Sequence, residues 1–278
     1  MNTQFTSVHV VPKLNASGDA TITKVVNLVT DTAKRLNVDV VGPTGINRGT
    51  LVVAIGGDGT MLEAMRVAAR ADATAIGVNL GRIGFLTDIS VQEHLTHAFA
   101  AALLRLTDTF VEERILLETS RADNLAVNEV SVSQLYADSM ITYRLLIGNV
   151  DAGVHRANGI LVSTPTGSTA YSLSVGGALM MPEMEAIQIV PVAPSTMTSR
   201  PIIVPATTSI ELQVWGGDVT VRTDGQVVDN VTESGWTPTK QSPYVIRVNA
   251  FNNKAKVLHF AGWNFFDVLT EKLGWKHE

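Results

Sequence analysis

Residues 51–69 read LVVAIGGDGTMLEAMRVAA. The five side chains of residues 51–55 are all apolar, which is typical of a strand buried on both faces of a parallel sheet. Three glycines at positions 56, 57 and 59 predict a tight loop, and residues 61–69 predict a helix. This order places backbone N–H groups and a helix N-terminus where they can bind phosphate. It predicts an α/β domain whose phosphate loop comprises Gly56, Gly57, Gly59 and Thr60.

Asp58 lies between two of these glycines, so little shields its carboxylate. A carboxylate in such a loop can accept the proton of a nucleophilic hydroxyl or orient Mg²⁺. The alternative is a purely structural helix cap, because Asp is a preferred residue at helix N-termini. The residues alone leave both interpretations open.

The first 108 residues continue the α/β pattern. Short apolar runs predict strands at 8–11, 38–41 and 75–78, and helical spacing predicts helices at 22–36 and 91–106. Phe85 follows the strand at 75–78, on the side where open α/β sheets bind ligands. We therefore expect a Rossmann-like α/β domain over residues 1–108.

From residue 109 the chain changes to short alternating strands separated by turns such as Asp224-Gly225, which predicts an all-β, sandwich-like domain over residues 109–260. The predicted strands are 111–119, 125–133, 141–147, 159–163, 187–192, 202–204, 209–215, 219–222, 244–248 and 256–260. Residues 261–278 return to helix. We expect this final helix to pack on the first domain and complete it.

Residues 162–174 read VSTPTGSTAYSLS and carry no charged side chain. Hydroxyl groups offer hydrogen bonds without burying ions, which suits a neutral ligand with many hydroxyls, such as a ribose. Tyr171 offers a surface on which a ring could stack. A plain Ser/Thr turn between strands is the alternative.

The composition excludes several classes of protein. A net charge of −5 with no basic cluster argues against nucleic-acid binding or an anionic membrane surface. The absence of cysteine excludes disulfides and thiolate metal sites, and the six histidines are scattered, so no side-chain cluster indicates a metal. We see no signal peptide and no apolar run approaching about 18 residues, and expect a cytoplasmic protein with no membrane partner.

Taken together, these motifs resemble the NAD kinases, which phosphorylate NAD to NADP. The similarity extends from Leu51 to the end of the chain. It is carried by GGDGT at 56–60, GVNLGRIGFLT at 77–87, AVNEV at 126–130, residues 158–177, Arg200-Pro201 and KLGW at 272–275.

The resemblance implies transfer of the γ-phosphoryl group of ATP to the 2′-hydroxyl of the adenosine ribose of NAD. Asp58 would be the catalytic residue, with Mg²⁺ or another divalent cation arriving with ATP near it. The α/β domain would hold ATP and the β domain NAD, so we expect the site between them. The implied NAD-binding residues are Asp58, Gly59, Phe85, Leu86, Asn128, Glu129, Arg156, Asn158, Thr169, Ala170, Tyr171, Ser172, Leu173, Ser174 and Gln226.

Asn158 departs from the family pattern, which has Asp before the glycine. Asn lacks the negative charge that would attract a nicotinamide cation, so we expect a weaker grip on NAD. Two other functions remain open: a lipid kinase acting on diacylglycerol or a sphingoid base, and a sensor that binds NAD or NADP without catalysis. The resemblance also implies a homodimer or homotetramer, and leaves open polyphosphate as a second donor.

Overall fold

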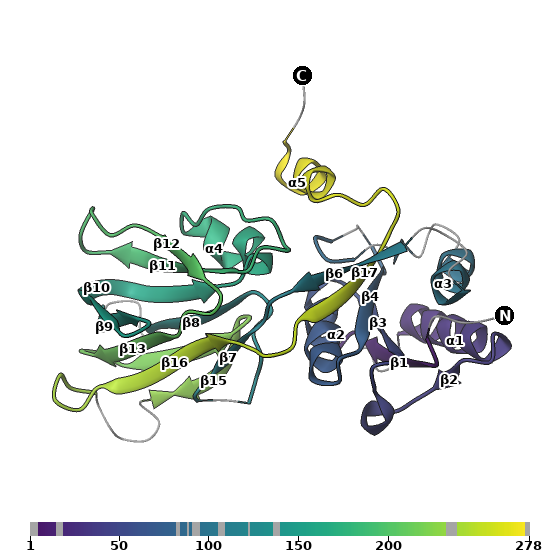
Figure 1. The fold of residues 1–278 in the computed structure, drawn as a ribbon, viewed down its shortest axis with the longest axis horizontal. Helices are drawn as coiled ribbons and strands as arrows, with labels where there is room; N and C mark the ends of the chain where they lie inside the picture. Colours follow the sequence, from purple (N-terminus) through teal and green to yellow (C-terminus); the bar gives the residue numbers. More distant parts are fainter. Residues whose placement is uncertain are drawn as a thin grey trace. The chain divides into compact units, whose positions relative to one another are not determined.

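The computed structural model describes residues 5–14, 19–81, 84–87, 89–90, 95–104, 109–121, 123–135, 140–231 and 238–275. The chain divides into two compact units (Figure 1). The first comprises Met1–Glu113 and Asn253–Glu278, and the second comprises Arg114–Asn252.

The first unit is built on a sheet with strand order β2-β1-β3-β4-β17-β6 and β5 beside β4. These strands are β1 (Ser7–Pro12), β2 (Asp39–Val40), β3 (Thr50–Gly56), β4 (Thr74–Asn79), β5 (Ile89–Ser90), β6 (Thr109–Arg114) and β17 (Ala255–Phe260). The pairs β1–β2, β1–β3, β3–β4, β4–β5 and β4–β17 are parallel. The helices are α1 (Ala20–Arg35), α2 (Asp58–Arg70), α3 (Leu95–Leu104) and α5 (Phe265–Leu273), with a 3₁₀ turn, η1, at Pro43–Gly45.

Hydrophobic burial explains why this unit folds as the pattern predicts. All seven residues of β3 are buried, as a strand covered by helices on both faces must be. Helix α1 buries Ile22, Val25 and Val29 along one face, and α1 and α3 lie together while α2 packs against β3 and β4 (Figure 1). Burying each such side chain contributes roughly 1.5–3 kcal/mol.

The second unit is an antiparallel sheet of ten strands. They are β7 (Leu117–Thr119), β8 (Glu129–Gln134), β9 (Ile141–Ile147), β10 (Val150–Ser163), β11 (Ala186–Pro194), β12 (Ile202–Pro205), β13 (Ile210–Trp215), β14 (Val219–Thr223), β15 (Gln226–Asn230) and β16 (Tyr244–Ala250). A 3₁₀ turn, η2 (Thr166–Thr169), and one helical turn, α4 (Tyr171–Ser174), follow β10.

Strand β10 divides this sheet into two branches. Its first half pairs with β9. In its second half, residues 159–163 pair with β8 on one side and residues 157–163 pair with β11 on the other. A register shift between Asp151 and Val154 marks an irregularity in the first half. Side chains from both branches, among them Val132, Ile160, Leu212 and Ile246, share one buried core. The prediction of an α/β domain followed by a sandwich-like β domain and a final helix is confirmed.

Two segments lie elsewhere than the strand pattern indicated. Residues 255–260 form β17, which pairs in parallel with β4 in the first sheet instead of joining the β domain. The stretch 111–119 is two strands, β6 in the first sheet and β7 in the second, because the chain passes between the units at buried Ile115 and Leu116. The compact units accordingly divide at 113/114 and 252/253, where the sequence suggested 108/109 and 260/261. The predicted helix at 91–106 is α3, and residues 91–94 and 105–108 lie outside the described part of the chain.

Among the residues that the structure describes, no helix has the length and apolar character that crossing a membrane requires.

Candidate functional site

Asp58 is the first residue of helix α2, directly after the glycine-rich end of β3. The cap is Gly57, whose carbonyl oxygen accepts hydrogen bonds from the N–H groups of Thr60 and Met61 at 3.0 and 3.1 Å. The Asp58 carboxylate takes no part in capping, so the helix-cap interpretation does not explain this residue.

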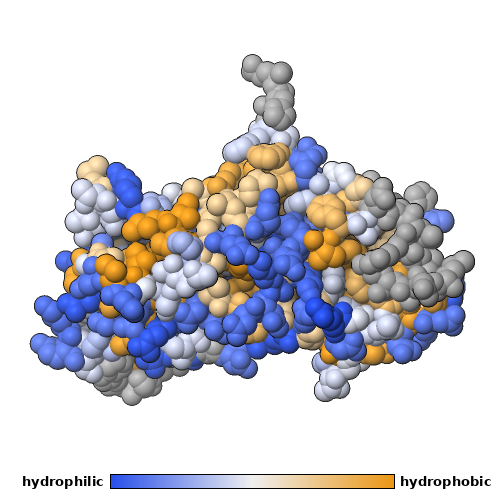
Figure 2. Space-filling view, viewed as in Figure 1, coloured by the Kyte–Doolittle hydropathy of each residue, from blue (hydrophilic) through white to orange (hydrophobic). Residues whose placement is uncertain are grey.

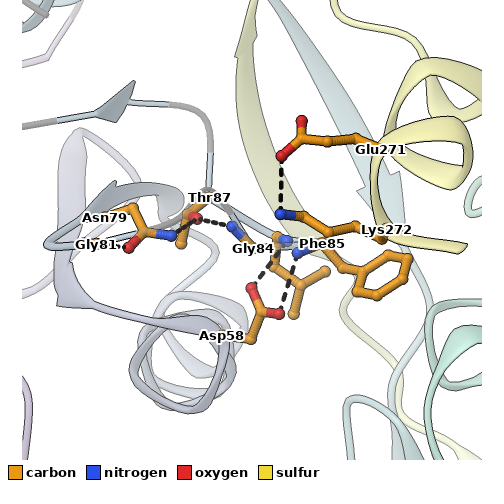
Figure 3. A network of polar contacts seen from close by, with 9 residues as sticks. Asp58, Asn79, Gly81, Gly84, Phe85, Thr87, Glu271 and Lys272 are labelled. Atoms are coloured by element: carbon orange, nitrogen blue, oxygen red, sulfur yellow. Dashed lines mark hydrogen bonds and ion pairs between the residues drawn. The ribbon is translucent and has the colours of Figure 1, made fainter. Parts of the chain in front are cut away.

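The carboxylate of Asp58 instead reaches the loop after β4 (Figure 3). The N–H of Phe85 donates to Oδ2 and the N–H of Leu86 donates to Oδ1, both at 3.0 Å. Two donors, one on each oxygen, fix the plane of the carboxylate. Each oxygen retains a lone pair for another partner.

The loop that holds Asp58 is itself anchored by Thr87 (Figure 3). Its buried hydroxyl oxygen accepts hydrogen bonds from the side-chain amide of Asn79 at 3.0 Å and from the N–H of Gly84 at 3.1 Å. The amide oxygen of Asn79 accepts a hydrogen bond from the N–H of Gly81 at 2.8 Å. The end of β4 therefore positions the two N–H groups that orient Asp58.

Close packing explains two glycines of this region. A Cβ atom at Gly84 would lie 2.0 Å from Oδ1 of Asp58, and one at Gly56 would lie 2.2 Å from the Thr60 hydroxyl oxygen. Cβ atoms at Gly57 and Gly59 would meet nothing within 4 Å. The phosphate loop is thus tightly packed at Gly56 and open at the next two glycines.

In the second unit, Asp224 holds the segment that contains Asn128 and Glu129. Its carboxylate accepts hydrogen bonds from the N–H groups of Val127, Asn128 and Glu129 at 2.9, 2.7 and 3.1 Å. Asp224 has φ of 47° and Gly225 has φ of 78°, which is the positive-φ pair of a tight hairpin between β14 and β15. The sequence pattern indicated only a turn here, and the Asp-Gly pair was the one available signal.

Glu129 is a buried carboxyl group, only 6% exposed, and its Oε2 has no hydrogen-bond partner in the part of the chain that the structure describes. Burial raises the pKa of Glu129 to about 7, and the nearby charge of Asp224 adds to that shift. A buried polar atom without a partner is costly, so it marks a place where a ligand donor fits.

The hydroxyl-rich stretch packs against the same segment. The Thr164 hydroxyl donates to the carbonyl oxygen of Val127 at 2.5 Å, and the Thr164 N–H donates to that of Asn128 at 2.9 Å. A Cβ atom at Gly167 would lie 2.1 Å from the Asn128 carbonyl oxygen, so only glycine allows this approach. The segments 127–129 and 163–167 therefore form one local structure.

Some hydroxyls of this stretch serve the fold. Ser172 is fully buried, and its oxygen accepts a hydrogen bond from the side-chain amide of Gln188 at 3.1 Å. The Thr169 hydroxyl donates to the carbonyl oxygen of Thr166 at 3.2 Å. The hydroxyl oxygen of Thr166 is buried and has no hydrogen-bond partner among the described residues, although nothing in the residue pattern singled out this threonine. Tyr171 is 46% exposed and available to a ligand.

The structure places the remaining predicted residues as follows. Leu86 is buried and Phe85 half-buried in the first unit. In the second unit, Asn128, Asn158, Ala170 and Leu173 are half-buried, and Arg156, Ser174 and Gln226 are exposed. The predicted residues thus fall into one group around Asp58 and one around Asn128 and Glu129. Arg156 and Asn158 belong to neither, because they lie farther along β10, where Gly159 pairs with Ser133 and only Ser163 pairs with Glu129.

Comparison with known protein families bears directly on these two groups. Residues 39–105 match the ATP-NAD kinase N-terminal domain, and residues 127–249 match the ATP-NAD kinase C-terminal domain. An NAD kinase of Shewanella woodyi is 40% identical over 241 residues, covering 82% of this chain and 78% of the relative. The chain belongs to the NAD kinase family.

Other NAD kinase family members agree with this assignment. The NAD kinase of Pasteurella multocida is 35% identical over 86% of this chain and 77% of its own. The crystal structure of an NAD kinase from Archaeoglobus fulgidus in complex with ATP has a TM-score of 0.73 and 25% identity, covering 98% of this chain and 100% of that one. Yeast NADH kinase complexed with NADH has a TM-score of 0.77 over 99% of this chain and 89% of that one, and at 18% identity it supports the fold alone.

Membership of the NAD kinase family confirms the function predicted from the sequence, phosphorylation of NAD to NADP by an ATP-dependent kinase. Neither the lipid-kinase nor the sensor alternative finds support among these relatives.

Proposed function

We propose that Asp58 accepts the proton of the 2′-hydroxyl of the adenosine ribose of NAD while that oxygen attacks the γ-phosphorus of ATP. The O–H bond breaks as the new P–O bond forms, and ADP leaves with the electrons of the broken P–O bond. The observation that carries this proposal is the orientation of the Asp58 carboxylate by the N–H groups of Phe85 and Leu86.

A base is needed because a ribose hydroxyl is a weak nucleophile near neutral pH. A positioned general base contributes about 10²- to 10⁴-fold to such a reaction. The hydrogen bonds to Phe85 and Leu86 leave a lone pair on each oxygen of Asp58 for the incoming proton.

The phosphates of ATP are proposed to lie against the phosphate loop of Gly56, Gly57, Gly59 and Thr60. Phosphoryl transfer depends mainly on positioning and on neutralising charge, and the N-terminus of α2 supplies N–H donors and a favourable dipole. The openness around Gly57 and Gly59 supports a close approach of a ligand to this backbone.

A divalent cation such as Mg²⁺ is proposed to accompany ATP, where it would neutralise phosphate charge. The described residues contain no group of three or more metal-binding side chains. Mg²⁺ in phosphoryl-transfer sites is commonly held by one or two carboxylates together with substrate phosphates. One oxygen of Asp58 could hold the cation, which leaves the lone pair of the other oxygen to accept the proton.

We propose that NAD is held by the β unit, Arg114–Asn252, and ATP by the α/β unit, Met1–Glu113 with Asn253–Glu278. Oε2 of Glu129 and the hydroxyl oxygen of Thr166 find no hydrogen-bond partner among the described residues, which supports a ligand beside the segment 127–129. The exposed ring of Tyr171 supports stacking of a base or ribose there. Ser172 is proposed to act by shaping α4 through Gln188, since its hydroxyl is already engaged.

The donor range, the oligomeric state and the location complete this proposal. Polyphosphate is proposed as an alternative phosphoryl donor, because the phosphate loop would contact only the phosphate groups of the donor. A homodimer or homotetramer is supported by the exposed Ile202 and Ile203 of edge strand β12, which lies in an apolar area of the second unit (Figure 2). The cytoplasm is the proposed location, because NAD and ATP are used there.

The test is NADP formation from NAD and ATP, read with an NADP-specific dehydrogenase. An NAD analogue with 2′-deoxyadenosine is the matched control and should inhibit competitively without being phosphorylated. Phosphorylation of this analogue would show that another hydroxyl is the acceptor. Tight NAD binding with no NADP formed under excess Mg-ATP would overturn the proposal.

A further inference from the structure

The topological switch point of the first sheet lies between strands β1 and β3, where the order of strand addition reverses. From β1 the chain passes through α1 to β2 on one side, and from β3 it passes through α2 to β4 on the other. In open α/β sheets, ligands bind outside the carboxyl ends of the strands at such a point. Here the N–H of Lys13, the residue after β1, donates to the carbonyl oxygen of Ile55 at 2.9 Å.

A groove of about 800 Å³ opens at this end of β1. It is lined by residues 9–14, by Thr23 and Val26 of α1 and by Val67 of α2, and most of its lining is apolar. Its volume falls within the range of roughly 300–1,000 Å³ that is usual for small-molecule sites. Glu63, the acidic residue of the lining, is paired with Arg66 at 2.7 Å, so its charge is compensated.

Lys13 brings a positive charge to the boundary between this groove and the phosphate loop. Its Cβ atom lies 3.3 Å from where a Cβ would stand on Gly56, the first glycine of that loop. Lys13 is exposed, and its ammonium group makes no ion pair or hydrogen bond within the described part of the chain. An uncommitted lysine next to a phosphate loop can bind a polyanion without first breaking another contact.

The geometry points to this groove as the donor site, in which Lys13 binds the phosphates of ATP and the apolar groove takes its base and ribose. The inference rests on the proposed function, because it requires that the phosphate loop beside Asp58 receives the triphosphate. The donor site then has two halves. The charged half, Lys13 and the phosphate loop, would bind any polyphosphate, whereas the apolar half, the groove, would bind only a nucleotide.

Two variants test the two halves separately, with ADP and inorganic tripolyphosphate as calorimetric probes on the full chain. Lys13→Met should raise the dissociation constants of ADP and tripolyphosphate about tenfold, which corresponds to the loss of one charge-assisted hydrogen bond. Thr23→Trp fills the groove from an exposed position and should weaken ADP about tenfold while leaving tripolyphosphate within about twofold. Lys24→Met and Asn27→Trp, on exposed positions of α1 outside the groove, are the matched controls.

Steady-state kinetics give a second readout. Both variants should raise KM for ATP and leave KM for NAD unchanged. If Lys13→Met binds ADP as tightly as the wild type, the role of Lys13 is overturned. If a folded Thr23→Trp binds ADP as tightly as the wild type, the role of the apolar groove is overturned. If the wild-type chain forms NADP while both variants bind ADP normally, the donor site alone is wrong. If the wild-type chain forms no NADP, the proposed function has failed.

Discussion

A Cβ atom added to Gly84 would lie 2.0 Å from Oδ1 of Asp58. Gly84→Ala must therefore displace the carboxylate from the N–H groups of Phe85 and Leu86. We predict a fall in kcat of about 100-fold with little change in the melting temperature, because small misplacements of a catalytic group have effects of this size.

Gly81→Ala is the control in the same loop, since a Cβ there would meet nothing within 4 Å. It should retain wild-type kcat. Equal activity of the two alanine variants would show that the orientation of Asp58 does not limit the reaction.

Asp224 is predicted to position the NAD-binding segment. Asp224→Asn replaces one acceptor oxygen with an NH₂ group that faces a backbone donor, so the three hydrogen bonds to residues 127–129 cannot all persist. KM for NAD should rise about tenfold or more, and the amide hydrogens of residues 127–129 should exchange faster. Asp218→Asn, in the chain just before β14, is the control, and protection of 127–129 equal to wild type would contradict this role.

The raised pKa of Glu129 predicts that the free energy of unfolding depends on pH. Its pKa rises from 4.5 to about 7 on folding, so the folded state is increasingly penalised as pH rises through this window. Glu129→Gln should increase the free energy of unfolding by up to about 3 kcal/mol at pH 8 and leave it nearly unchanged at pH 4.5.

Chemical unfolding at the two pH values measures this effect, with exposed Glu183→Gln as the control. A stability gain of the same size at both pH values would mean that packing, and not ionisation, distinguishes Gln from Glu129.

Asn158 is predicted to lower the affinity for the nicotinamide cation of NAD, compared with the Asp of the family pattern. Asn158→Asp restores a negative charge, and a charge pair in a hydrated site is worth about 1 kcal/mol, so KM for NAD should fall about fivefold. The inhibition constant of NADH, whose nicotinamide is uncharged, should change little. Equal shifts for NAD and NADH would show that this side chain does not face the nicotinamide.

Local sequence patterns predicted the elements near Asp58 because those elements depend on neighbouring residues. The uninterrupted apolar run of β3 and the glycines after it require a buried parallel strand and a phosphate loop, and the structure has both. The position of β17 was not predictable in this way, because its apolar residues would suit either sheet. Only its pairing with β4, far away in sequence, assigns it.

Hydrogen bonds made by backbone N–H groups could not be predicted from the sequence either. The resemblance implies only that Phe85 and Leu86 bind NAD, yet in the structure their N–H groups hold Asp58. Asp224 showed only as a turn residue, although its carboxylate binds three N–H groups. Such contacts depend on the path of the chain and leave no mark on residue type.

The most direct test of the account is the turnover of Asp58→Asn in saturating NAD and Mg-ATP. Asn keeps the size of the side chain but cannot accept the proton of the ribose hydroxyl. We predict that kcat falls at least about 100-fold while the affinity for ADP stays within a few-fold of wild type. A kcat within about threefold of wild type would contradict the role of Asp58 as the base.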